Sequence, residues 1–212
     1  AFDFAGEVIE ALRAADAAII VCSAKDGLSV GAERAWKRLA KSKLPRLIYV
    51  SKLDEENGDF NGVFHALREK FGKAVAPLII PIWDENKKVT GIVDVLHKNA
   101  FTMENGKTVE IELPEDKISV VDELYEALKE SVAETSEEFM DKFFGGEDFT
   151  YAEMIQGLRQ GVRELSMFPV LCGSAVNCMG SLMLMDYIVD LLPNPMEGNY
   201  HKATKSDGET EE

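Results

Sequence analysis

Three short and nearly uninterrupted apolar runs constrain the fold of this chain most strongly. They cover residues 17–22, 46–50 and 168–172. Apolar runs of this length without polar alternation are typical of parallel strands buried on both faces of a sheet. Segments with helical spacing of apolar residues lie beside these runs, at residues 6–15, 32–39, 63–71 and 181–192. The sequence therefore predicts an α/β fold in which a parallel sheet is flanked by helices.

A different pattern interrupts this alternation. Apolar runs at residues 78–82, 91–95 and 107–111 are joined by short loops, which predicts an antiparallel meander. One long helix is expected to start near Ser119, to end at Gly145 and Gly146, and to be followed by a helix at residues 151–162. We therefore divide the chain into a discontinuous α/β domain (residues 1–74 and 167–195), an inserted α+β subdomain (75–166) and a linker or tail (196–212).

Composition excludes several classes of protein. The net charge of -15 argues against sequence-specific nucleic-acid binding through the bulk surface. No apolar run is long enough to span a bilayer, no signal peptide is visible, and the three cysteines are too scattered for a disulfide framework. A cytoplasmic protein without membrane contact is expected. His65 and His97 lack a partner at metal-ligand spacing and are expected to be structural.

Two polar turns follow buried strands at positions where an open parallel sheet places its ligand site. Ser-Lys-Leu-Asp (residues 51–54) follows the second run and Gly-Ser-Ala (173–175) follows the third. The carboxylate of Asp54 can accept hydrogen bonds from both N1–H and N2–H₂ of guanine, a donor pair that adenine lacks. The stem of Lys52 can lie across the base. The N–H of Ala175 can donate to guanine O6, while Ser174 can hold its loop by a side-chain-to-backbone bond.

A solvated turn is the simpler interpretation of residues 51–54 alone, because short motifs recur by chance. The wider pattern favours a site, since the chain resembles bacterial elongation factor G over roughly residues 2–195. The matching motifs are D-F-x-G-E-V (3–8), R-x-x-D-x-A (13–18), G-I-V-D (91–94), P-V-L-C-G-S-A (169–175) and D-x-L-P-x-P (190–195).

This resemblance implies a translational GTPase with a P-loop-type sheet, incomplete in this chain. The parent protein would bind GTP or GDP with Mg²⁺, hydrolyse GTP on the ribosome and promote translocation. The guanine-binding positions carried by this chain would be Ser51, Lys52, Asp54, Ser174 and Ala175. Ser51 replaces the usual Asn of the family, which suggests an elongation-factor-G-like paralogue.

No G-x-x-x-x-G-K-S/T sequence is present, so the phosphate-binding loop and its Mg²⁺ ligand are absent. The chain starts without Met, and we expect a fragment of the parent protein. The fragment is expected to hydrolyse nothing, to hold no cofactor tightly and to contain no catalytic residue of the family.

Four acidic residues of the expected long helix share one face: Glu130, Glu134, Glu137 and Asp141. A solvated surface is the ordinary explanation of such a stripe. The resemblance implies a second one, contact with the basic C-terminal domain of the ribosomal stalk protein. A non-catalytic interaction module is therefore the alternative function, and a ribosome-protection or peptide-release GTPase shares the same guanine loops.

Overall fold

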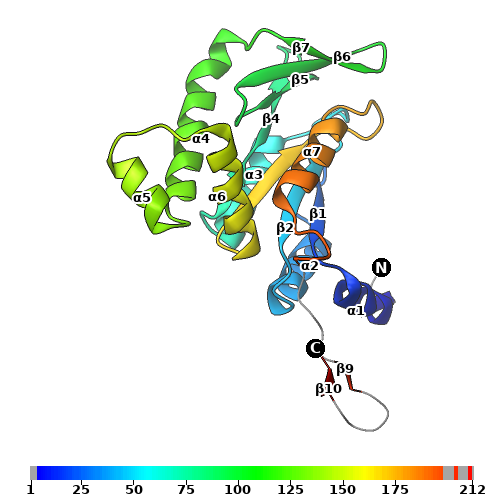
Figure 1. Ribbon diagram of the computed structural model, residues 1–212. Coiled ribbons are helices and arrows are strands. Elements are labelled where there is room, and N and C mark those ends of the chain that lie inside the picture. The colour runs from blue at the N-terminus through cyan, green and yellow to red at the C-terminus, as the bar shows by residue number, and fades with distance from the viewer. Residues whose placement is uncertain (1–3, 198–202, 205–209, 212) are drawn as a thin grey trace.

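The computed structural model describes residues 4–197, 203–204 and 210–211, and its centre is a four-stranded parallel sheet (Figure 1). The strand order is β1-β2-β8-β3, with neighbours paired in parallel. These strands are β1 (Ala18–Ser23), β2 (Arg46–Ser51), β8 (Phe168–Cys172) and β3 (Val75–Pro77). The predicted α/β class is confirmed.

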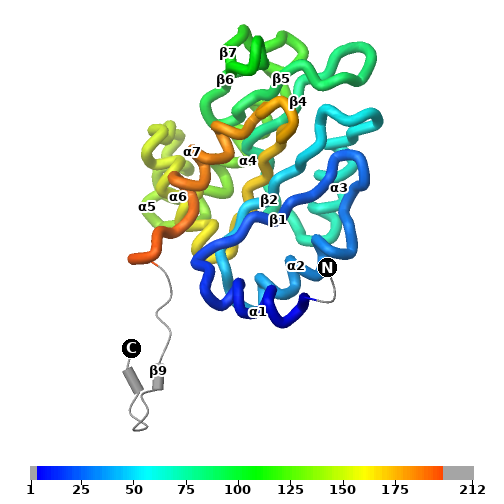
Figure 2. Tube along the Cα trace, turned by 90° about the vertical axis from the view of Figure 1, so that its right-hand side faces the viewer, coloured from blue at the N-terminus to red at the C-terminus, as the bar shows by residue number. Residues whose placement is uncertain are grey.

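Burial on both faces explains why the two central strands, β2 and β8, are largely apolar. Every residue of β8 is buried, and so is every residue of β2 except Ser51 at its end. Helices α2 (Val30–Lys41) and α3 (Phe60–Phe71) lie on one side of the sheet, and α6 (Tyr151–Arg163) and α7 (Ser181–Leu191) on the other (Figure 2). Helix α1 (Ala5–Ala14) precedes β1 and contains no buried residue.

Strand β3 was missed by the sequence analysis. Its three residues pair with β8, with Val75 opposite Phe168 and Pro77 opposite Val170. The chain leaves the parallel sheet after Pro77, three residues beyond the boundary expected at residue 74. We therefore place the start of the proposed insertion at Leu78.

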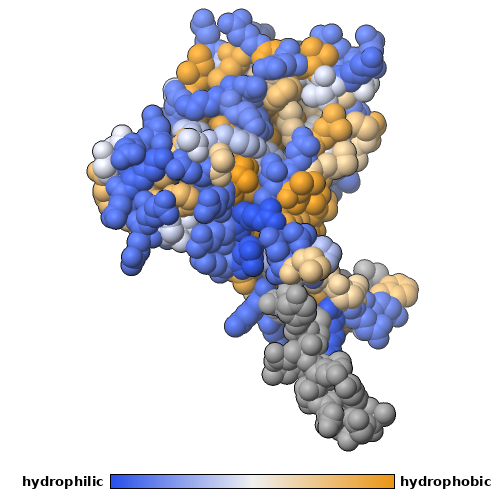
Figure 3. Space-filling model, viewed as in Figure 1, coloured by the Kyte–Doolittle hydropathy of each residue, from blue (hydrophilic) through white to orange (hydrophobic). Residues whose placement is uncertain are grey.

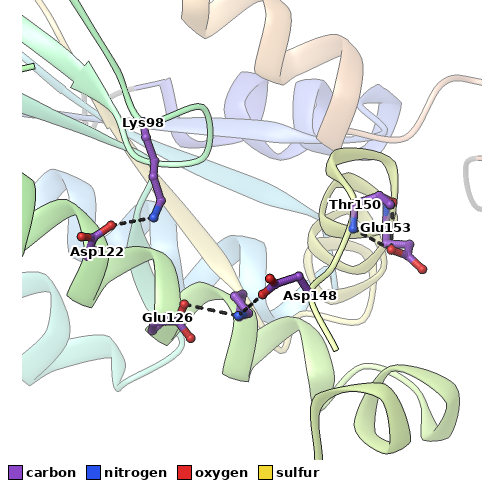
Figure 4. Close-up of polar contacts among 7 residues, drawn as sticks. Lys98, Asp122, Glu126, Asp148, Thr150 and Glu153 are labelled. Atoms are coloured by element: carbon purple, nitrogen blue, oxygen red, sulfur yellow. Dashed lines mark hydrogen bonds and ion pairs between the residues drawn. The ribbon is translucent and has the colours of Figure 1, made fainter. Parts of the chain in front are cut away.

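The predicted antiparallel meander is present in the insertion, in the order β4-β5-β6-β7, but it has one strand more than the three expected, because β6 (Asn99–Glu104) was missed. Its strands are β4 (Ile79–Trp83), β5 (Val89–Asp94), β6 (Asn99–Glu104) and β7 (Lys107–Ile111). Ion pairs join helix α4 (Glu115–Ala133) to the turn between β5 and β6 and to Asp148, which lies further along the chain. Lys98 Nζ lies 2.6 Å from Asp122 Oδ1, and the nearly buried Lys129 contacts Glu126 at 3.3 Å and Asp148 at 3.0 Å (Figure 4).

The expected single long helix is wrong, because two helices occupy that segment. Helix α4 (Glu115–Ala133) begins directly after Pro114, and α5 (Glu137–Phe144) follows a break at residues 134–136. The hydroxyl of Thr135 donates to the carbonyl oxygen of Val132 at 2.7 Å, and the hydroxyl of Ser136 accepts from Phe139 N–H at 3.1 Å. Hydroxyl side chains that bond local backbone groups in this way compete with helix continuation.

The end of the chain lies largely outside the described residues, including most of the predicted tail at 196–212. In that stretch β9 (Ala203–Thr204) and β10 (Thr210–Glu211) pair antiparallel. Apolar surface gathers over α7, where Leu182, Met185 and Val189 are exposed (Figure 3). Among the described residues, no helix combines the length and the hydropathy that crossing a membrane requires.

Candidate functional site

Three loops meet at the carboxyl ends of β1, β2 and β8, which are neighbours in the sheet. We call residues 51–59, at the end of β2, the first loop, and residues 173–180, after β8, the second loop. Leu53 N–H donates to the carbonyl oxygen of Gly173 at 3.3 Å, and Gly173 N–H donates to that of Val50 at 3.0 Å. Ala24 N–H, beyond β1, donates to the carbonyl oxygen of Ser51 at 2.8 Å. Backbone hydrogen bonds therefore join the two turns that the sequence analysis selected.

The first loop alternates between the interior and the solvent. Leu53 is buried, whereas its neighbours Lys52 and Asp54 are exposed and Ser51 is half-buried. Lys52 has a left-handed backbone with φ 64°, a conformation uncommon for a residue other than glycine. The buried Leu53 anchors the turn, so the two charged side chains project from the edge of the sheet.

Opposite charges surround the ammonium group of Lys52. Its Nζ lies 3.6 Å from Asp26 Oδ2 and 3.4 Å from Glu55 Oε1, and Lys25 Nζ lies 2.8 Å from Glu55 Oε2. The Ser23 hydroxyl, and then Lys52, hold the pKa of Asp26 below its usual value. The hydrogen bond from Lys25 lowers the pKa of Glu55. Both carboxylates therefore stay ionised around the lysines at neutral pH.

The second loop is closed by its backbone. Ser174 N–H donates to the carbonyl oxygen of Met179 at 3.0 Å, while Cys178 and Gly180 take left-handed conformations. The expected side-chain bond of Ser174 is not formed: its hydroxyl oxygen is buried without a hydrogen-bond partner among the described residues. The peptide N–H of Ser174, and not its hydroxyl, therefore holds the loop. Ala175, the next residue, is exposed.

Gly173 is held between two groups that the sequence analysis missed. A Cβ at this position would collide with the carbonyl oxygen of Met179 and with the hydroxyl oxygen of Tyr49. Burial raises the pKa of Tyr49 to about 12, so the hydroxyl stays protonated. Tyr49 lies within the apolar strand β2, and the residues around it give no indication that its hydroxyl meets the turn at Gly173. The glycine is needed because the backbone of the second loop passes so close to β2.

The structure thus brings Ser51, Lys52, Asp54, Ser174 and Ala175 onto two joined loops at one edge of the sheet. Asp54 and Ala175 are both exposed there. Their roles as ligands of a base stay predictions.

The acidic stripe is changed by the break between helices. Glu130 lies on α4 and Glu134 at its C-terminal end, whereas Glu137 and Asp141 lie on α5. The four therefore do not share one face of one helix, as the sequence analysis expected. All four are exposed, and within residues 4–197 none of them forms an ion pair.

Comparison with known proteins agrees with the fold. The family of the elongation factor Tu GTP binding domain matches residues 1–194. A crystal structure of a protein from Thermus thermophilus is 35% identical with a TM-score of 0.86, and the match covers 92% of this chain and 29% of that one. The chain thus spans less than a third of the length of that protein. It belongs to the elongation factor Tu GTP-binding domain family.

Proposed function

We propose that this chain supplies the guanine-recognition part of an elongation-factor-G-like GTPase that promotes translocation on the ribosome. The backbone hydrogen bond between Leu53 and Gly173 carries the proposal, because it brings the two candidate base-binding turns together. The motifs shared with elongation factor G support the finer assignment, and Ser51 in place of Asn supports a paralogue.

Each exposed group has a distinct role in this proposal. Asp54 accepts hydrogen bonds from N1–H and N2–H₂ of guanine, and the N–H of Ala175 donates to O6. The stem of Lys52 covers one face of the base, and its ammonium group stays paired with Asp26 and Glu55. Adenine would leave the carboxylate without donors, which is a strong source of discrimination.

These residues fit the base and not the phosphates. The sequence contains no G-x-x-x-x-G-K-S/T loop, and the described residues hold no group of three or more His, Cys, Asp or Glu side chains arranged for a metal ion. GTP and Mg²⁺ would therefore require a phosphate-binding segment from elsewhere in the parent protein. No hydrolytic step is assigned to the residues of this chain.

An NMR titration of the ¹⁵N-labelled chain with GDP and ADP tests base recognition. We expect GDP at millimolar concentration to shift the amides of Leu53, Asp54 and Ala175, and ADP to leave them unchanged. Asp54→Asn should abolish the response to GDP and create one to xanthosine diphosphate, whose C2 carbonyl accepts from the new amide. Glu56→Gln, an exposed change in the same loop, is the matched control.

Two results would overturn the proposal. Equal shifts with ADP would show that the loops do not select guanine. GTP turnover by the purified chain would show that it holds a phosphate site after all. Assays of the parent protein in translocation, peptide release and ribosome protection would separate elongation factor G from the relatives that share these loops.

A second candidate function is docking of a basic protein domain on the acidic residues of α4 and α5. Glu130, Glu134, Glu137 and Asp141 are exposed without cationic partners in residues 4–197, which leaves their charge available. The ribosomal stalk protein's C-terminal domain is the partner that the resemblance implies. Binding of that domain should weaken as salt is raised. It should also weaken when these four residues are neutralised, whereas Glu104→Gln on β6 should leave it unchanged. Salt-independent binding, or none, would remove this candidate.

A further inference from the structure

One buried carboxylate connects the insertion to the helix that follows the second loop. Asp94, at the end of β5, is only 4% exposed. Its Oδ1 accepts hydrogen bonds from the N–H groups of Leu96 at 3.0 Å and His97 at 3.1 Å, and from the Tyr187 hydroxyl of α7 at 2.8 Å. His97 Nδ1 lies 2.9 Å from its second oxygen. A buried carboxylate is costly without such partners, so β5 and α7 are held together at this point.

The same strand also passes near the start of α7. A Cβ at Gly180 would lie only 2.5 Å from the carbonyl oxygen of Cys172, so the helix begins tightly against the end of β8, and that Cβ would lie at an ordinary 3.4 Å from Ile92 Cδ1 of β5. Ile92 and Asp94 are two residues apart and therefore point to the same side of the strand. Strand β5 thus holds α7 through the hydrogen bond from Tyr187 to Asp94, and its Ile92 side chain lies near the N-cap residue Gly180.

Backbone hydrogen bonds join the second loop to the start of α7, so the two move together. Its closing bond joins Ser174 to Met179, and Met179 is followed directly by Gly180 at the helix start. Ser181 N–H donates to the carbonyl oxygen of Cys178 at 3.2 Å, and Leu184 N–H donates to that of Gly180 at 3.0 Å. A movement of α7 must therefore displace the residues that present Ala175.

We propose that Asp94 is a positioning residue that couples the insertion to the second loop by fixing α7 through Tyr187. The role of the loop in base recognition rests on the proposed function, whereas the coupling itself does not. Energetic coupling is reciprocal. A partner bound to the insertion would alter the order of the second loop, and a base held by the loop would alter the insertion.

Hydrogen exchange of backbone amides in the complete chain, without nucleotide, tests this coupling. Tyr187→Phe removes only the hydroxyl that meets Asp94. We expect exchange of the amides of residues 173–180 to become roughly tenfold faster, the scale set by a hydrogen bond to a charged acceptor. Tyr125→Phe on α4 is the matched control, because it keeps the ring that Lys98 Nζ faces at 4.5 Å and removes no hydroxyl bonded to α7. It should leave the second loop unchanged.

Variants of Asp94 provide the conservative comparison. Asp94→Asn keeps an oxygen that can accept from Tyr187 and should give exchange between that of the wild type and that of Asp94→Ala. Faster exchange of β6 and β7 to the same extent as the second loop would indicate general destabilisation and overturn the proposal. An unchanged second loop in Tyr187→Phe would overturn it as well. Neither result depends on nucleotide binding, so failure of the proposed function would be seen separately.

Discussion

The carbonyl oxygen of Gly173 accepts a hydrogen bond from the N–H of Leu53, which joins two loops that the whole insertion separates in sequence. Each loop follows a buried strand, and the two strands pair in parallel, with Val50 opposite Cys172. The parallel register sets where the strands end, and the backbone bond then fixes one loop against the other. The candidate site is therefore a consequence of strand pairing and not of contacts between its charged side chains.

Gly173→Ala should disrupt this junction. The added methyl group would collide with the carbonyl oxygen of Met179 and the hydroxyl of Tyr49, one of which is backbone and has little room to move. We expect the free energy of unfolding to fall by about 1–3 kcal/mol, the usual cost of overpacking. The amide signals of residues 173–180 should also shift. Urea denaturation and ¹⁵N NMR spectra measure the two effects.

Gly31→Ala is the matched control for that change. Gly31 lies in α2, where a Cβ would have Ser29 Oγ as its nearest neighbour at an ordinary 3.5 Å. Alanine is favoured over glycine in helices, so stability should be unchanged or higher. If Gly173→Ala proved as harmless as Gly31→Ala, the close approach of the second loop to β2 would be wrong.

Thr150→Ala should weaken the start of α6. The Thr150 hydroxyl accepts from Glu153 N–H at 3.3 Å, while Glu153 Oε2 accepts from Thr150 N–H at 2.6 Å (Figure 4). Removing such an N-cap typically costs about 1 kcal/mol, which urea denaturation would detect. Thr150→Ser keeps the hydroxyl and should retain most of the stability. Equal losses in the two variants would argue against a capping role.

Lys129 offers a test of charge against packing in the insertion. Its side chain is 11% exposed, and its partners Asp148 and Glu126 are largely exposed. Lys129→Met keeps the apolar stem and should change stability by less than about 1 kcal/mol, because the carboxylates of Asp148 and Glu126 are in water and no buried charge is left unpaired. Lys129→Glu would place a third carboxylate there and should cost more than about 3 kcal/mol. Thermal unfolding of the two variants gives the comparison.

The sheet could be predicted because a strand that is buried on both faces has an uninterrupted apolar sequence. Every residue of β8 is buried, and its apolar run at residues 168–172 matches the strand. Strand β3 could not be recognised, because three residues are too few to establish any period. The polar turns could be selected from the ends of the predicted strands. Their closure could not, since it depends on the backbone of Met179 and not on the Ser174 hydroxyl.

The break between α4 and α5 shows how periodicity can mislead. Val132 and Phe139 lie on opposite sides of the break, yet both are buried in the same core. Apolar spacing therefore continues although the backbone does not, and only Thr135 and Ser136 mark the interruption. The contact between Asp94 and Tyr187 had no local trace at all, because its partners come from separate elements and are brought together by the tertiary fold.

The pair of His97 and Asp94 should make stability depend on pH. The hydrogen bond to Asp94, and then its negative charge, raise the pKa of His97 despite partial burial. The other titratable groups that act on the imidazole are Tyr151 on α6 and two residues of α7, Asp186 and Asp190. Because the folded state favours the protonated imidazole, this contribution is fully present below the unfolded pKa of about 6.5. It is lost as the pH rises through the folded pKa.

The free energy of unfolding should therefore decrease as the pH is raised from about 6.5 through the folded pKa of His97. Urea denaturation at a series of pH values measures this slope, and His97→Gln should remove it while keeping a polar side chain beside Asp94. His65→Gln, on the exposed surface of α3, should leave the slope in place. A slope that persists in His97→Gln and vanishes in His65→Gln would assign the pH dependence to α3 instead. Asp94 also accepts a hydrogen bond from the Tyr187 hydroxyl. Tyr187→Phe should nevertheless leave the sign of the slope unchanged, because the imidazole keeps its own contact with the carboxylate.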